Sequence, residues 1–208
     1  MSPALIAQPQ APPPRIARIT VDQYHRMIKT GILREGDPIE LLDGMLVYKD
    51  RSARGKNPMG IGELHNVVVS LLGRLTARLE ALGCYMQIQG PISLPPHHEP
   101  EPDGAIVKGV PRDYTTRLPG PDDVCCVIEV ADSSLAHDRT TKLRIYAQAG
   151  IPQYVVINLV DSQIELYEQP VPAEGRYANA AVVKAGETLA LRTSDAGTLQ
   201  LPAAQVLP

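Results

Sequence analysis

The 208-residue chain contains no phenylalanine and no tryptophan, and all of its aromatic residues are tyrosines, eight in number. The core must therefore be mainly aliphatic, and a protein that stacks successive bases on several aromatic rings is not expected. The three cysteines form no CxxC pair, which argues against a disulfide scaffold and a cysteine-rich zinc site. No stretch approaches the roughly 18 apolar residues of a membrane-spanning helix. We therefore expect a cytoplasmic protein without membrane contact.

The chain also lacks a large excess of either charge, since 20 Lys and Arg residues oppose 23 Asp and Glu residues. This balance argues against a protein that coats nucleic acid through its overall charge, but it leaves room for a local basic cleft. With 44% hydrophobic residues, the chain can bury a core of ordinary size. We expect a disordered proline-rich leader over residues 1–18, a main domain over 19–170 and a C-terminal strand extension of that domain over 171–208.

Local sequence patterns predict most of the elements. Thr20 and Gln23 fit a capping box for a helix over residues 20–30, and Asp43-Gly44 between two apolar runs indicates a β-hairpin. Apolar residues spaced by three and four over 62–82 predict one long amphipathic helix. The later segments are expected as strands over 84–94, 103–108, 124–131 and 153–158, a helix over 138–149, a strand at 163–168 that pairs back as a hairpin, and short strands over 176–208.

The order of these elements indicates the fold class. The strands at 84–94, 103–108 and 124–131 follow one another directly before the helix at 138–149 intervenes. The sheet must therefore contain antiparallel as well as parallel pairs. The run VCCVIEVA at 124–131 is apolar on both faces, as expected for the central strand of a covered sheet. The sequence thus predicts an α/β fold with a central mixed β-sheet flanked by helices, an N-terminal helix and hairpin, and short C-terminal strands.

Glu129 is the exception within the apolar run at 124–131. Burying a carboxylate costs several kcal/mol unless it is paired or ligates a cation. A structural ion pair with an arginine is one explanation. The other involves Asp103, at the start of another strand, because two carboxylates at neighbouring positions in a sheet would form a negative pocket. Hard oxygen ligands of this kind suit Mg²⁺ or Mn²⁺.

The helix that follows the Glu129 strand carries Lys142. It lies three residues after Arg139 and four before Tyr146, so the three side chains are expected to share a face. A lysine near Glu129 can orient a water molecule or stabilise charge on a phosphate. Taken alone, Lys142 is better explained as an ordinary solvated helix residue, and Asp138 is expected to be the N-cap of this helix.

These residues occur in an order that resembles the PD-(D/E)XK nuclease superfamily, which has the restriction-endonuclease-like fold. The wider pattern is more similar to the Uma-type family: IELLDGMLV, then His65 at the start of the long helix, EPDGAIV, and VIEVADSSLAHDRTTKLRIYAQAGIPQYVVIN. The resemblance covers roughly residues 20–169, and the block at 127–158 is its most specific part. It implies a core in the order α-β-β-β-α-β.

The resemblance implies a metal-dependent endonuclease that hydrolyses phosphodiester bonds in DNA with a metal-bound water as nucleophile. Asp103 and Glu129 would be ligands of Mg²⁺ or Mn²⁺, and Lys142 would be the catalytic lysine. Glu40 and His65 fall at positions where the family carries matching residues near the site, so the resemblance makes them accessory residues.

One position departs from the broader superfamily. The usual Glu-x-Lys would place a lysine two residues after Glu129, where this chain has Ala131. The family pattern takes the lysine from the following helix instead, which assigns Lys142. Lys108, at the end of the Asp103 strand, is a weaker substitute.

The expected partners follow from this interpretation. The loop residues Arg51, Arg54 and Lys56 would contact the DNA backbone, or else are simply solvated. A homodimer is expected because cutting both strands of a duplex usually needs two sites. One alternative is a catalytically inactive nuclease-fold protein that binds nucleic acid or a protein partner. Another is a hydrolase of a small phosphate compound, although no glycine-rich phosphate loop supports it.

Overall fold

The computed structural model describes residues 15–34, 36–49, 62–194 and 197–208. Its main elements, in chain order, are α1 (Val21–Lys29), β1 (Ile39–Leu42), β2 (Met45–Tyr48), α2 (Glu63–Gly73), α3 (Thr76–Glu80), β3 (Cys84–Ile88), β4 (Gly104–Lys108), β5 (Val124–Ala131), α4 (Leu135–His137), the π-helical turn η3 (Asp138–Lys142), α5 (Leu143–Gln148), β6 (Gln153–Asn158), β7 (Gln163–Val171), β8 (Arg176–Val183), β9 (Thr188–Arg192) and β10 (Thr198–Pro202). Short 3₁₀ turns cover Pro111–Tyr114, Pro172–Glu174 and Ala203–Gln205.

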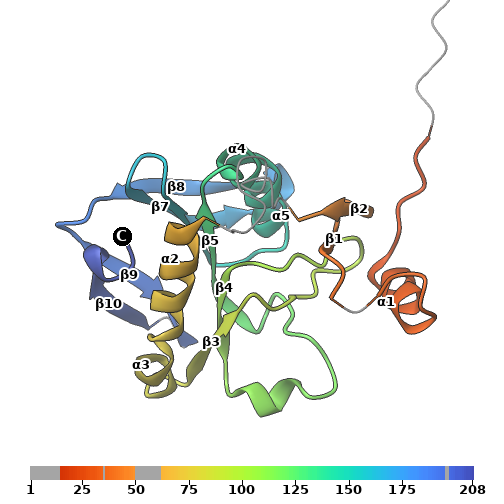
Figure 1. Cartoon of the computed structure of the whole chain (residues 1–208), viewed down its shortest axis with the longest axis horizontal. Coiled ribbons are helices and arrows are strands. Elements are labelled where there is room, and N and C mark those ends of the chain that lie inside the picture. Colours follow the sequence, from red (N-terminus) through yellow and green to blue (C-terminus); the bar gives the residue numbers. More distant parts are fainter. Residues whose placement is uncertain (1–14, 35, 50–61, 195–196) are drawn as a thin grey trace, which may run out of the picture.

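A six-stranded sheet in the order β3-β4-β5-β6-β7-β8 forms the centre of the molecule (Figure 1). The β5–β6 pair is parallel, and the other four pairs are antiparallel. The hairpin β1–β2 and the pair β9–β10 form separate two-stranded sheets. The predicted α/β fold with a mixed central sheet is therefore confirmed. No helix in the described ranges combines the length and the apolar character needed to cross a bilayer.

Two apolar clusters cover the two faces of the sheet. One joins α2, α3, β9 and β10 to Cys126, Ile128 and Val130 of β5. The other joins α5 and the β1–β2 hairpin to Val127 and Ala131 of the same strand. Because side chains alternate along a strand, Glu129 belongs to the second face, beneath α5. The helical layers on the two sides can be followed in Figure 1.

The local predictions near the N-terminus are confirmed. Thr20 caps α1, and Thr20 and Gln23 form both hydrogen bonds of the capping box. Asp43 and Gly44 have φ angles of 52° and 68° between β1 and β2. These two positive values are those of a hairpin turn that suits the twist of the strands, and an Asp-Gly pair adopts them at low cost.

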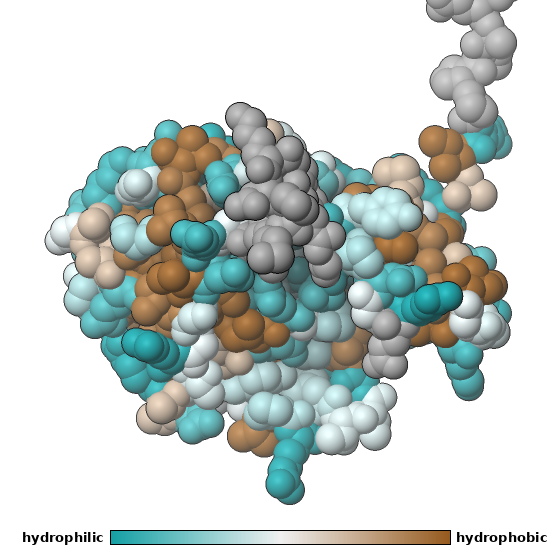
Figure 2. Space-filling view, viewed as in Figure 1, coloured by the Kyte–Doolittle hydropathy of each residue, from teal (hydrophilic) through white to brown (hydrophobic). Residues whose placement is uncertain are grey.

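The prediction of a single long helix over residues 62–82 is wrong, because the structure has two helices there, α2 and α3. The amides of Arg74 and Leu75 donate to carbonyls three residues back, and Gly73, a weak helix former, ends α2. Leu64 and Val67 fit the apolar spacing but are 55% and 49% exposed. Apolar side chains accordingly reach the surface over α2 in Figure 2.

Two further boundaries differ from prediction. The strand expected over 84–94 ends at Ile88, because Gln89 has a positive φ of 46° and Gly90-Pro91 follows. The helix expected from Asp138 begins at Leu135, so Asp138 is not an N-cap. Asp138 instead opens the π-helical turn, where it accepts a hydrogen bond of 2.6 Å from the Ser134 hydroxyl.

Candidate functional site

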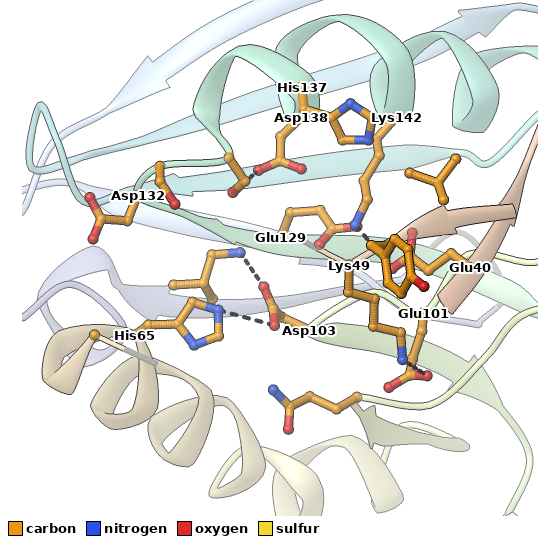
Figure 3. Close-up of a pocket in the computed structure, with 17 residues that line it drawn as sticks. Glu40, Lys49, His65, Glu101, Asp103, Glu129, Asp132, His137, Asp138 and Lys142 are labelled. Carbon is orange, nitrogen blue, oxygen red and sulfur yellow. Dashed lines mark hydrogen bonds and ion pairs between the residues drawn. The ribbon is translucent and has the colours of Figure 1, made fainter. Parts of the chain in front are cut away.

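A cavity of about 380 Å³ opens where β4 begins and β5 ends, between the start of α2 and the turn η3 (Figure 3). The start of β4, the end of β5, the first turn of α2, the β1–β2 hairpin and the turn η3 all contribute to its walls. Its lining includes every catalytic and accessory residue predicted from the sequence: Glu40, His65, Asp103, Glu129 and Lys142. Side chains that are distant along the chain therefore meet at one place.

Asp103 and Glu129 are neighbours because of the strand register. Gly104 of β4 pairs with Ile128 of β5 in an antiparallel ladder, so the next residues outward, Asp103 and Glu129, lie across from each other. The backbone amide of Val130 donates to Asp103 Oδ2 at 2.9 Å, which fixes this carboxylate at the end of the ladder. The predicted juxtaposition of two strand-borne carboxylates is thus present.

Glu129 is 3% exposed and accepts two hydrogen bonds on one oxygen. Lys142 Nζ and the Tyr146 hydroxyl each lie 2.8 Å from Glu129 Oε1. Burial raises the pKa of Glu129 well above its ordinary value of 4.5, the Lys142 ammonium partly offsets this, and nearby carboxylates add to it. The partner of Glu129 is therefore a lysine and not the arginine that the structural alternative proposed.

Lys142 reaches the cavity from the last position of η3. Burial by itself lowers the pKa of its amine, but the carboxylates of Glu129, Glu40 and Asp138 outweigh burial and raise that pKa above 10.5. The lysine therefore remains an ammonium group. Arg139 does not share its face as predicted: its guanidinium pairs with Glu165 of β7, because the wider π turn changes the angular spacing of the side chains.

Asp103 also contacts His65, whose Nε2 lies 3.2 Å from Asp103 Oδ1. Burial opposes ionisation of Asp103, yet the His65 ring, the Val130 amide and Lys142 together lower its pKa below 3.8. Conversely, burial lowers the pKa of His65, but Asp103 and two further aspartates reverse this and raise it above 6.5. His65 and Asp103 thus favour the charged form of each other.

Glu40 lies on β1 opposite Val47 and is 5% exposed. Its Oε1 is 3.7 Å from Lys142 Nζ, which is an ion-pair distance but too long for a hydrogen bond. A glutamate on a two-stranded hairpin is ordinarily exposed. The structure places Glu40 at the buried end of the hairpin instead, beside the lysine.

Several residues in or next to the cavity were not given a role in the site from the sequence. Tyr146 has the apolar spacing of a core residue, and its hydroxyl contact with Glu129 leaves no mark in the pattern. Asp138 was interpreted as a helix cap. Lys49 and Glu101 form an ion pair at the cavity wall. The sequence offered one signal: Glu101 lies two residues before Asp103. Side chains two residues apart in an extended segment point to the same side.

Other candidates lie elsewhere. Lys108 is at the opposite end of β4 from Asp103 and donates to the Asp122 carbonyl, so it cannot substitute for Lys142. The predicted DNA-contacting residues Arg51, Arg54 and Lys56 lie outside the described residues.

The donor set fits a hard divalent cation bound together with a substrate. In the described ranges, no group of three or more His, Cys, Asp or Glu side chains is arranged to hold a metal ion by itself. Mg²⁺, however, is typically held by one or two carboxylates, with waters and substrate phosphates completing its coordination. Asp103 and Glu129 supply such a pair of carboxylates, and both are oxygen donors without soft ligands nearby. They are the residues that would hold the ion.

Comparison with known proteins identifies the family of this chain. No curated protein shows significant sequence similarity to it. Its fold is similar to the crystal structure of a "putative nuclease belonging to DUF820" from Anabaena variabilis ATCC 29413, with 17% sequence identity and a TM-score of 0.64 over 90% of this chain and 97% of that one. Residues 21–204 match the model of the Uma2 family, described as "Putative restriction endonuclease". The match spans most of the chain, and the protein therefore belongs to the Uma2 family.

Proposed function

We propose that this protein is a divalent-metal-dependent endonuclease that hydrolyses phosphodiester bonds in DNA. One observation carries the proposal: Asp103, Glu129 and Lys142, from two adjacent strands and the following helical segment, line the same cavity. Family membership supports a nuclease in general terms. The metal, the substrate and the residue roles are our inference from the site.

Each side chain has a role that its surroundings favour. A bound Mg²⁺ or Mn²⁺ would lower the pKa of a water molecule and offset charge on the phosphate. Asp103 and Glu129 would hold that ion, and His65 keeps Asp103 ionised and oriented. The Lys142 ammonium, buried and with a raised pKa, would stabilise negative charge that develops on the phosphate under attack.

Two features of the substrate complex belong to the same proposal. Arg51, Arg54 and Lys56 follow β2, whose last residue lies at the cavity wall, and they would contact backbone phosphates without reading the sequence. Cleavage of both strands of a duplex would require two copies of the chain related by a two-fold axis.

The test is a plasmid-nicking assay with Mg²⁺ or Mn²⁺. We expect nicking by the wild type that is abolished by EDTA, and a loss of at least about 100-fold in Asp103→Asn and Glu129→Gln. Glu80→Gln, which changes an exposed carboxylate on α3, is the matched control and should retain activity. Equal nicking by all four proteins would assign the signal to a contaminating nuclease.

An inactive nuclease-fold protein is the second candidate, and two observations favour it. Lys142 already neutralises Glu129, and no three metal-ligating side chains converge in the described residues. In that case the carboxylates are structural, and the surface binds nucleic acid or a protein without cutting. Calorimetric titration with Mn²⁺ separates the two candidates, since an absence of binding heat in the wild type supports the inactive protein.

A further inference from the structure

Lys142 lies between two buried carboxylates but is hydrogen-bonded to only one. Its Nζ is 2.8 Å from Glu129 Oε1 and 3.7 Å from Glu40 Oε1. Figure 3 shows the two carboxylates on different sides of the ammonium group, with Asp103 beyond Glu129. A movement of about one ångström by the flexible end of the lysine would exchange one hydrogen bond for the other.

Glu40 has acceptor capacity that no described residue fills. The side chain is 5% exposed, so little bulk water solvates it, and none of the side-chain hydrogen bonds within the described residues involves it. The antiparallel hairpin holds it in place through pairing of β1 with β2. A buried carboxylate without a hydrogen-bond donor gains more from an approaching ammonium group than an already satisfied carboxylate does.

The ammonium group and a divalent cation would compete for Glu129. Lys142 and Tyr146 both donate to Oε1, so the positive charge of the lysine already offsets the carboxylate that a metal ion would need. If the lysine leaves, the Tyr146 hydroxyl still holds Glu129 in position. Two positive charges would otherwise share one buried carboxylate and repel each other.

We infer that Glu40 is the alternative partner of Lys142: when a divalent cation binds Asp103 and Glu129, the ammonium group moves from Glu129 to Glu40. Glu40 is then a positioning residue that acts through the lysine, and not a metal ligand. This inference rests on the proposed function, because it assumes that Asp103 and Glu129 bind a cation. It adds that the divalent cation replaces the Lys142 ammonium group at Glu129.

The test is calorimetric titration of Mn²⁺ into the wild type, Lys142→Met, Glu40→Gln and the double variant, without DNA. We expect Lys142→Met to bind Mn²⁺ about tenfold more tightly, because the competing charge is removed. Glu40→Gln should bind about tenfold more weakly in the wild-type background but by less than about threefold in the Lys142→Met background. Circular dichroism melting checks that each variant is folded.

Other outcomes are decisive as well. An equal loss from Glu40→Gln in both backgrounds would make Glu40 a metal ligand and overturn the inference. So would unchanged Mn²⁺ affinity in Lys142→Met. If these variants do not fold, crystals of the wild type with and without Mn²⁺ provide the second measurement. Lys142 Nζ should then lie within hydrogen-bond distance of Glu40 only when Mn²⁺ is bound, and an unchanged contact with Glu129 would refute the exchange.

The inference and the proposed function can fail separately. Mn²⁺ binding without coupling between Glu40 and Lys142 overturns the inference alone. Coupled Mn²⁺ binding in a protein that cuts no DNA supports the inference and overturns the proposed nuclease activity. An absence of Mn²⁺ binding in all four proteins overturns both.

Discussion

Two buried glutamates on the same face of the sheet have opposite surroundings. Val156 of β6 pairs with Glu129 on one side and with Glu165 of β7 on the other, so the three residues lie in one row across the sheet. The turn η3 above them supplies a cation to each carboxylate: Lys142 to Glu129 and Arg139 to Glu165. The two sites therefore share one face of the sheet, one helical turn and one type of charge pair, and they differ in how many hydrogen bonds each carboxylate accepts.

Glu165 is satisfied on both oxygens. Arg139 donates to both, and Asn158 and Tyr167 each donate at 2.8 Å. Burial opposes its ionisation, but these donors lower its pKa to about 2. Glu129 has two donors on one oxygen, and its pKa is raised. A carboxylate with all of its acceptor capacity filled therefore serves stability, whereas one with capacity left can accept a ligand.

The largest expected difference is in stability. Glu165→Gln should lower the free energy of unfolding by about 2–3 kcal/mol, because Arg139 loses the carboxylate that pairs with it. Glu129→Gln should cost less than about 1 kcal/mol, since the amide oxygen still accepts from Lys142 and Tyr146, Glu40 remains as an opposite charge for Lys142, and a disfavoured buried charge is removed. Urea denaturation of both variants and the wild type measures this. Equal losses would mean that Glu129 is a structural ion-pair partner like Glu165.

The pH dependence of stability should have opposite signs at the two sites. The depressed pKa of Glu165 gives stability that is present above about pH 4.5 and is lost as the pH falls towards 2. Allowing for solvent screening, this contribution is about 1–2 kcal/mol. The raised pKa of Glu129 has the reverse effect, so stability is lost as the pH rises above 4.5.

Thermal unfolding between pH 2.5 and 8 measures both effects. The wild type should gain stability relative to Glu165→Gln as the pH rises, and should lose stability relative to Glu129→Gln. Parallel curves for the two variants would refute the assignment of opposite pKa shifts.

The smallest effect concerns one hydroxyl at each site. Tyr146 and Tyr167 each donate to their glutamate at 2.8 Å, which makes Tyr146→Phe and Tyr167→Phe a matched pair. We expect each to cost about 1 kcal/mol or less, with the smaller loss for Tyr167→Phe because Glu165 keeps its other donors. Urea denaturation of the two variants and the wild type would show which variant loses more free energy of unfolding. A larger loss in Tyr167→Phe would mean that the crowded donors around Glu165 depend on one another.

The sequence predicted those features that depend on neighbouring residues. The Thr20 cap, the Asp43-Gly44 turn and the buried strand β5 were all predicted correctly because a few adjacent side chains determine them. The break after Gly73 was missed, because a glycine within an apolar pattern is usually tolerated and tertiary packing decides whether the helix continues.

The site could be predicted only in part from local sequence patterns. Asp103 and Glu129 stood out because carboxylates are rare in apolar strands, and the structure places them together with Lys142 at one cavity. The contacts of Glu40 with Lys142 and of His65 with Asp103 join residues that are far apart along the chain. No local pattern encodes such pairs. The family resemblance pointed to these residues, and the fold explains why they meet.

The π-helical turn at Asp138–Lys142 has a consequence for how such a site can change. A helix rotates by about 100° per residue, and a π turn holds one residue more than an α turn. Because Lys142 runs directly into α5, deleting one residue between Arg139 and Lys142 would leave the lysine, Ile145 and Ala147 in place and would turn Arg139 by about 100° around the helix axis. Gain or loss of one residue in this turn, more than any exchange of side chains, would therefore decide whether one helical segment can place a cation at both Glu165 and Glu129.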